Sequence, residues 1–345
     1  MIVTGKQQSN IMTTFKIYKL HFTSPLHIGD RHEDDSNSLK TIQSDTLYAA
    51  LISCLAKTGC QIPENGDLGF VVSSLFPYFQ KDKYSKPIYF LPNPMKARLP
   101  EIDVSKIKKV KKMQWVDTSF YEKILSGESL SDDIIPNIQD CYLTKAQLPE
   151  DINESKEFVK SEVSQRVKIN SRTGDEDAEP YYVDKVLFRY ESGLYFIAEG
   201  NTDLLEKALK LLSIEGIGTD RNVGFGFFNY STDELSIELP KRANHQVSLS
   251  LMIPESKEQL KSLMDSEDVA YDFTRRGGWI TTYPYTSLRK NAIYGFLPGS
   301  VFSLKNGETY SVIGKIANLK PGIGQLTPNH PIWRNGKAIM LPMYI

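Results

Sequence analysis

The segment between Gly216 and Tyr230, GIGTDRNVGFGFFNY, has residue types and a spacing that could bind an anion. Glycine permits positive φ angles and close backbone approach. Exposed amides of such a loop can face an anion, and arginine pairs with phosphate through two hydrogen bonds. The alternative is a tight turn whose glycines only let neighbouring elements pack. The candidate anion-binding residues are Gly218, Thr219, Asp220, Arg221, Asn222, Gly224 and Gly226.

Two well-known nucleotide-binding motifs do not describe this loop. It does not follow a strand and open a helix as G-x-G-x-x-G, so the pattern argues against a dinucleotide site. It also lacks the Gly-Lys-Ser/Thr ending of a P-loop.

The histidines offer the clearest candidates for acid–base chemistry. His27 and His32 lie near Asp30 and a run of acids at 33–35, but their spacing matches no common zinc motif. Imidazole titrates near neutral pH, so His27 could act as a general base on an RNA 2′-hydroxyl. It could equally hydrogen-bond a neighbour or a phosphate without doing chemistry. The sequence contains neither G-x-S-x-G nor H-E-x-x-H.

A second candidate contact lies at 275–279, RRGGW. Arginine planes and Trp279 could stack on unpaired bases, and the glycines permit close backbone approach. A β-bulge at the start of a strand is the other interpretation.

Composition limits the class of protein. The 345 residues are 40% hydrophobic and 24% charged, which is typical of globular proteins and gives enough length for two domains. The net charge is −1, so a nucleic-acid site must be a local patch. Three cysteines without C-x-x-C indicate neither a disulfide framework nor a cysteine zinc site. No signal-peptide core or membrane span is visible, so we expect a cytoplasmic protein. The motifs present do not call for a metal or a cofactor, and we expect neither.

Hydrophobic periodicity predicts the elements that position these residues. Residues 14–22 alternate as a strand, with Phe15 and Ile17 on one face. Helices are predicted from Ser44 to Gly59 and over 202–215, each with one apolar stripe. Residues 81–112 carry ten Lys/Arg against three acids, which suits a solvated face or the steering of an anionic partner. The sequence YYVDKVLFRY-ESG-LYFIAEG predicts two strands across a short turn.

The order of these elements predicts an α+β fold. Residues 14–240 suit a β-α-β-β-α-β, ferredoxin-like unit with basic insertions at about 80–180. An exposed hairpin arm with an acidic tip is expected near 163–180, and residues 1–13 are expected to be a flexible tail. A second unit follows the linker PKRAN, over 241–345. It closes with an expected hairpin at Asn335-Gly336, a strong hairpin signal.

Six segments in order resemble the RAMP proteins of type III CRISPR systems, most closely the fourth-subunit family of the type III-A Csm effector complex. They are SPLHIG with SDTLYAALI, KINSRTG, GIGTDRNVGFGFF, RRGGWITT, IYGFLPGSVF and HPIWRNGKAIMLP. The resemblance implies two tandem ferredoxin-like (RRM-like) RAMP domains and a non-catalytic subunit in antiviral or anti-plasmid defence.

The resemblance also implies partners and site residues. The partners are the 5′ handle of the CRISPR RNA, the large polymerase-like subunit and the backbone RAMP subunit, with target RNA reached only indirectly. Segment 163–180 resembles the hairpin that such subunits insert near the first guide bases. The handle contacts implied, besides the glycine loop, are His27, Gly29, Ser44, Arg166, Lys168, Asn170, Arg172, Arg275, Arg276, Trp279 and Thr281.

Two other functions stay open at this point. One is a CRISPR-RNA processing endoribonuclease of the Cas six type, which shares tandem ferredoxin-like domains and a glycine loop. Such enzymes usually carry that loop near the C-terminus, whereas here it lies mid-chain. The other is the equivalent handle-binding subunit of the type III-B complex.

Overall fold

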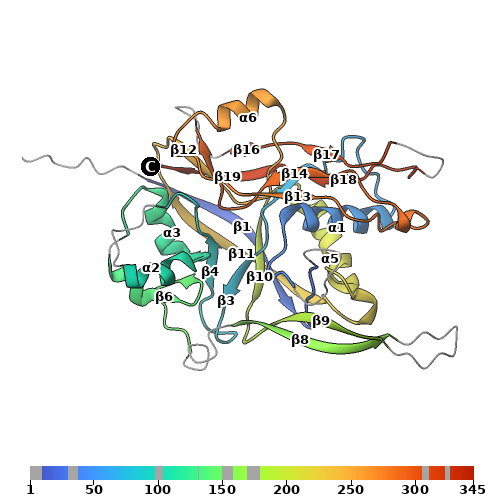
Figure 1. Cartoon of the computed structure of the whole chain (residues 1–345), viewed down its shortest axis with the longest axis horizontal. Coiled ribbons are helices and arrows are strands. Elements are labelled where there is room, and N and C mark those ends of the chain that lie inside the picture. Colours follow the sequence, from blue (N-terminus) through green and yellow to red (C-terminus); the bar gives the residue numbers. More distant parts are fainter. Residues whose placement is uncertain are drawn as a thin grey trace, which may run out of the picture.

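The computed structural model describes residues 10–29, 38–97, 104–130, 132–149, 158–168, 179–304, 311–322 and 327–345. It has a mixed α+β fold, as predicted, with one large sheet and few helices (Figure 1). The main sheet has the strand order β11-β1-β10-β3-β4-β5-β7-β6, and β2 also pairs with β10. The bounds are β1 Ile11–Phe22, β2 Phe70–Val72, β3 Phe76–Phe79, β4 Ile88–Pro92, β5 Trp115–Asp117, β6 Ile138–Gln139, β7 Tyr142–Leu143, β10 Gly193–Gly200 and β11 Phe228–Leu239.

Strand β1 is the centre of this sheet. It pairs antiparallel with β11 over its whole length and with β10 over its second half. The predicted alternation is confirmed, because Phe15 and Ile17 enter one buried cluster while Tyr18 and Leu20 enter another. The strand begins at Ile11 instead of residue 14. Most of the predicted tail, residues 1–9, lies outside the described residues.

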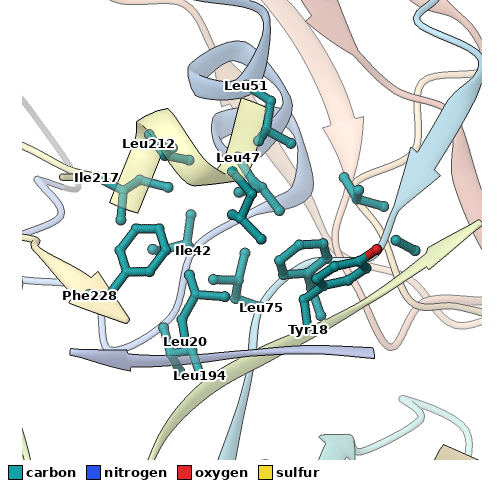
Figure 2. Packing of buried hydrophobic residues seen from close by; sticks show 14 of the residues in the cluster. Tyr18, Leu20, Ile42, Leu47, Leu51, Leu75, Leu194, Leu212, Ile217 and Phe228 are labelled. Carbon is teal, nitrogen blue, oxygen red and sulfur yellow. The ribbon is translucent and has the colours of Figure 1, made fainter. Parts of the chain in front are cut away.

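Helices α1 (Ser44–Lys57) and α5 (Thr202–Glu215) cover one face of the sheet. Figure 2 shows Leu47 and Leu51 of α1 packed with Leu212 of α5 above Leu20 of β1. The apolar stripes predicted for these helices are buried, since a helix presents i, i+3 and i+4 on one side. None of the helices within the described ranges is long and apolar enough to cross a membrane.

A basic helix lies in the insertion between β4 and β5. Helix α2 (Val104–Lys111) lies in the lysine-rich segment, with Val110 buried and Lys108 and Lys111 exposed. The region also contains α3 (Thr118–Leu125) and the 3₁₀ turn η1 (Asp132–Asn137). Asp117 caps α3 by accepting the amide hydrogen of Phe120.

Strands β8 (Val159–Lys168) and β9 (Glu179–Phe188) form a separate antiparallel ladder at the edge of the molecule (Figure 1). The two strands predicted on either side of the turn at 191–193 are present as β9 and β10, but each pairs with a strand other than its expected neighbour. Strand β9 pairs with β8, while β10 enters the main sheet between β1 and β3. Residues 169–178, which hold the predicted acidic tip, lie outside the described residues.

The last hundred residues form smaller sheets stacked on the first unit (Figure 1). A four-stranded sheet has the order β15-β12-β19-β16, and two further pairs are β13–β14 and β17–β18. The bounds are β12 His245–Ser248, α6 Lys257–Leu263, β13 Phe273–Arg276, η3 Tyr285–Ser287, β14 Ile293–Phe296, β15 Val301–Ser303, β16 Ser311–Ile313, β17 Ile316–Asn318, β18 Trp333–Asn335 and β19 Ala338–Met343.

The predicted hairpin at Asn335-Gly336 is wrong. Strand β18 pairs with β17, and β19 pairs with β12 and β16. Gly336 instead joins neighbouring loops: its amide donates to the Lys315 carbonyl and its own carbonyl accepts from Ile253. A Cβ on Gly336 would collide with the Ile253 side chain. The glycine therefore serves close packing.

Candidate nucleic-acid interface

The base of the glycine loop is fastened to the loop that follows β1. The Thr219 amide donates to the His27 carbonyl at 3.0 Å, and the Gly226 amide donates to the Pro25 carbonyl at 2.8 Å. The Ile217 amide donates to Gly226 at 3.0 Å and closes the loop on itself. Ile217 is buried beside Leu212 (Figure 2), which anchors the loop in the core below α1 and α5.

The glycines divide into two groups by what surrounds them. A Cβ on Gly226 would collide with the Ile217 carbonyl, and one on Gly218 with the His27 carbonyl. Both residues also have positive φ, so only glycine suits them. Gly224 has a φ of 94°, but nothing lies within 4 Å of its Cβ position. The packing and anion-binding interpretations therefore apply to different parts of one loop: its base packs and its tip is open.

The tip consists of the 3₁₀ turn η2 (Arg221–Val223) and the residues around it. Asp220 adopts a left-handed conformation with φ 57°, and its carbonyl accepts the amides of Val223 and Phe225. Arg221 and Asn222 are exposed. The described residues offer no acceptor to the backbone amides of Asp220, Arg221 and Asn222. These amides and the Arg221 guanidinium can therefore face an incoming anion.

Arg166 of β8 reaches this loop. Its Nη1 lies 3.1 Å from Oδ2 of Asp220, and its guanidinium lies 4.7 Å from the centre of the Phe225 ring. The structure thus brings three sequence-predicted groups together: the His27–Gly29 loop, the glycine loop and Arg166. Arg166 therefore links β8 to the glycine loop, and a quarter of its side chain is exposed.

His27 is buried, and its Nδ1–H donates to the Asp184 carbonyl. Asp184 is also buried; its carboxylate accepts the Ser38 amide and the Ser161 hydroxyl. The imidazole therefore holds β9 against the loop after β1 and does not face solvent. Gly29 is exposed and lies opposite Ser38 in an isolated bridge.

Ser44 also lies inside the protein. It is fully buried at the start of α1, and its hydroxyl oxygen accepts the amide of Leu251 at 2.9 Å. Its own amide donates to the Ser74 hydroxyl. The structure therefore gives Ser44 the role of joining the two halves of the chain, and its side chain does not reach the surface.

Arg276 also lies at the contact between the two halves of the chain. Its Nε and Nη2 lie 2.7 and 3.0 Å from the two carboxylate oxygens of Asp45, and Nη1 of Arg334 lies 2.7 Å from Oδ2. Burial alone would raise the pKa of Asp45, but the Arg334 and Arg276 guanidiniums outweigh it and hold that pKa below its ordinary value. No local sequence pattern marks Asp45 and Arg334 as partners, because they lie 289 positions apart along the chain.

Lys290 lies close enough to this cluster to be affected by it. Desolvation and the positive charges of Arg334 and Arg276 lower the pKa of Lys290 to about 8, against the opposing effect of Asp45. The cluster thus contains three basic groups and one carboxylate.

The other predicted residues of the second unit lie at the surface. Arg275 and Thr281 are exposed, and Trp279 is half-buried with the Arg289 guanidinium stacked 4.7 Å from its ring centre. Lys168 is the last residue of β8, and Asn170 and Arg172 lie outside the described residues. The described ranges contain no group of three or more histidines, cysteines and acids that could hold a metal, and His32 with its acidic neighbours falls outside them.

Two family models match nearly the whole chain between them. The RAMP superfamily model matches residues 19–229, and the CRISPR Csm4 C-terminal domain model matches residues 241–343. Over 323 residues the chain is 27% identical to the CRISPR system Cms protein Csm4 of Mycobacterium tuberculosis (strain CDC 1551 / Oshkosh), covering 92% of this chain and 94% of that one. It is 24% identical to the protein of that name from Streptococcus thermophilus, with 89% and 93% covered.

Solved structures share the fold. A chain of the Csm3–Csm4 subcomplex in the type III-A CRISPR-Cas interference complex superposes with a TM-score of 0.58 at 17% identity, covering 96% of this chain and all of that one. A chain of the Csm1–Csm4 cassette in complex with AMPPNP gives 0.57 at 16% identity, covering 96% and 99%. Fold, family models and relatives agree, and this chain belongs to the RAMP superfamily and carries a Csm4 C-terminal domain.

Proposed function

We propose that this chain is a non-catalytic subunit of a type III-A CRISPR interference complex that binds the 5′ handle of the CRISPR RNA. The observation that carries the proposal is the glycine loop, whose base is fixed to residues 25–27 and whose tip presents Arg221 and backbone amides to which no described residue offers an acceptor. A single-stranded RNA backbone is recognised by such amides together with arginine and small polar side chains.

The relatives support this assignment and suggest the protein partners. Similar chains occur in structures of a Csm1–Csm4 cassette and a Csm3–Csm4 subcomplex. By analogy, this subunit docks the large polymerase-like subunit to the backbone RAMP filament. Its contact with target RNA is indirect, through those neighbours.

We also propose that the chain divides into ferredoxin-like units at 14–240 and 241–345. The strand order β11-β1-β10-β3, with α1 after β1 and α5 after β10, supports that arrangement for the first unit. The β8–β9 ladder is proposed as the arm that reaches the first guide bases. Its exposed Val163, Val167 and Tyr182 support this, since they are apolar side chains on a two-stranded extension.

The position of His27 favours a binding role over a processing endoribonuclease. A general base must reach the proton that it removes. His27 is buried, and its Nδ1–H is engaged by the Asp184 carbonyl.

The test is retention of CRISPR RNA by the assembled complex. Arg221→Ala should reduce the CRISPR RNA that copurifies when the chain is co-expressed with the other subunits and the repeat array. Arg242→Ala removes another exposed arginine and is the matched control. Unchanged RNA retention in the Arg221 variant would argue against handle binding by the loop. Specific cutting of repeat RNA by the purified wild-type chain, abolished by His27→Ala, would favour the processing enzyme instead.

A further inference from the structure

The β13–β14 ribbon presents an aromatic face to solvent. Arg275 lies directly opposite Tyr294, and Phe273 lies opposite Phe296. Directly paired residues, and residues two apart on one strand, share a face of the sheet. Phe273 is 54% exposed and Tyr294 59% exposed, with ring centres 5.8 Å apart in an edge-to-face arrangement. Such exposure of neighbouring aromatic rings indicates a binding surface.

The opposite face of the ribbon is held firmly. Arg276 makes its two-pronged contact with Asp45 there, and a Cβ on Gly295 would come within 2.6 Å of the Leu251 side chain. On the aromatic face itself, Phe296 packs edge-to-face on the buried Phe302 and fixes one end of that face. The exposed rings therefore stand on a fixed platform, which limits the ordering that binding would require.

The stretch of sequence that carries this face contains basic residues and no acid. Residues 273–304 contain four basic residues and no Asp or Glu: Arg275, Arg276, Arg289 and Lys290. The nearest acid along the chain, Asp272, is exposed and accepts the Phe273 amide. Exposed aromatic rings beside arginine, in a stretch without acids, suit unpaired bases joined by phosphates.

We infer that the outer face of β13–β14 binds single-stranded RNA, with Phe273 and Tyr294 stacking on bases and Arg275 pairing with phosphate. The inference deepens the proposed function, because it gives the same RNA a second contact on the C-terminal unit. Stacking needs only the flat face of a base, so this surface is expected to accept many sequences.

The experiment measures binding of the purified full-length chain to two fluorescein-labelled probes. One is a 12-nucleotide oligouridine, and the other is an abasic RNA with the same number of phosphates. The double variant Phe273→Ala/Tyr294→Ala should weaken binding to oligouridine by about tenfold or more and leave binding to the abasic probe unchanged. Arg275→Ala should weaken both. Tyr294→Phe keeps the ring and should bind as the wild type does, as should Tyr84→Ala, which removes a fully exposed tyrosine elsewhere.

Three results would overturn the inference. The first is no binding of oligouridine by the wild-type chain. The second is an equal loss of binding to oligouridine and to the abasic RNA in the double variant. The third is full RNA binding with lost copurification of another subunit, which would assign the face to a protein partner. Because handle binding is tested by CRISPR RNA retention in the Arg221 variant, the two proposals can fail separately.

Discussion

Arg166 and Asp220 connect a strand of the β8–β9 ladder to the tip of the glycine loop, with 3.1 Å between Nη1 and Oδ2. The conformation of the loop is therefore stabilised by this contact as well as by its own glycines. Its tip is held from outside by a residue that lies 54 positions earlier in the chain.

The first prediction concerns this contact. Arg166→Ala and Asp220→Asn, combined in a double-mutant cycle, should give a coupling free energy of only about 0.5–1 kcal/mol, because both side chains are partly solvated. Hydrogen exchange should nonetheless quicken at the amides of Val223 and Phe225, which donate to the Asp220 carbonyl. Exchange identical to that of the wild type would show that the Arg166–Asp220 contact does not stabilise the tip of the loop.

The second prediction concerns the base of the loop. Gly226→Ala should destabilise the protein by about 3 kcal/mol or more, because the new Cβ meets the Ile217 carbonyl at a positive φ. Gly29→Ala is the matched control, since nothing lies within 4 Å of its Cβ position, and it should be neutral. Urea unfolding of both variants provides the comparison, and equal midpoints would contradict the prediction.

The sequence predicted local elements better than their partners. The helices predicted from Ser44 to Gly59 and over 202–215 are present, the first ending at Lys57, and the two-faced strand at 14–22 was correct, because hydrophobic periodicity depends on neighbouring residues. The hairpin at 335–336 was wrong, and the two strands predicted over 181–200 pair with other strands, because pairing depends on residues distant in the sequence. The same limit applied to the site. Ser44 and Arg276 have polar side chains suited to RNA, yet residues more than 200 positions away engage them.

The third prediction concerns the buried carboxylate between the two halves. Asp45→Asn should destabilise the protein by about 3–5 kcal/mol at pH 7, because Arg276 and Arg334 would lose their counter-charge. Glu267→Gln, at an exposed position, should have little effect. The folded-state pKa of Asp45 lies below the ordinary 3.8, so its stabilisation is present above that pH and is lost as pH falls through the folded value. The free energies of unfolding of the wild type and of Asp45→Asn should therefore become equal in strong acid.

The fourth prediction concerns Lys290. A lysine whose pKa falls to about 8 on folding destabilises the protein below that pH, and the penalty disappears as pH rises from 8 to the ordinary 10.5. Lys290→Met should therefore raise the free energy of unfolding at pH 7 by at most about 3 kcal/mol, and should gain less at pH 10. If the β13–β14 segment binds RNA, the same variant should bind oligouridine more weakly. An equal gain in stability at pH 7 and pH 10 would mean that the methionine stabilises the protein by packing and not by removing a charge.

The contact between Asp45 and its two arginines has a consequence for how the chain is made. Asp45 leaves the ribosome 231 residues before Arg276 and 289 before Arg334. Until Arg276 has been made, the Asp45 carboxylate has neither guanidinium, and until Arg334 has been made it has only one. A product that stops before β18 can present every residue of the glycine loop and still lack one of the two charges that hold the halves together. Synthesis of β18 is therefore the step that completes the set of charges around Asp45.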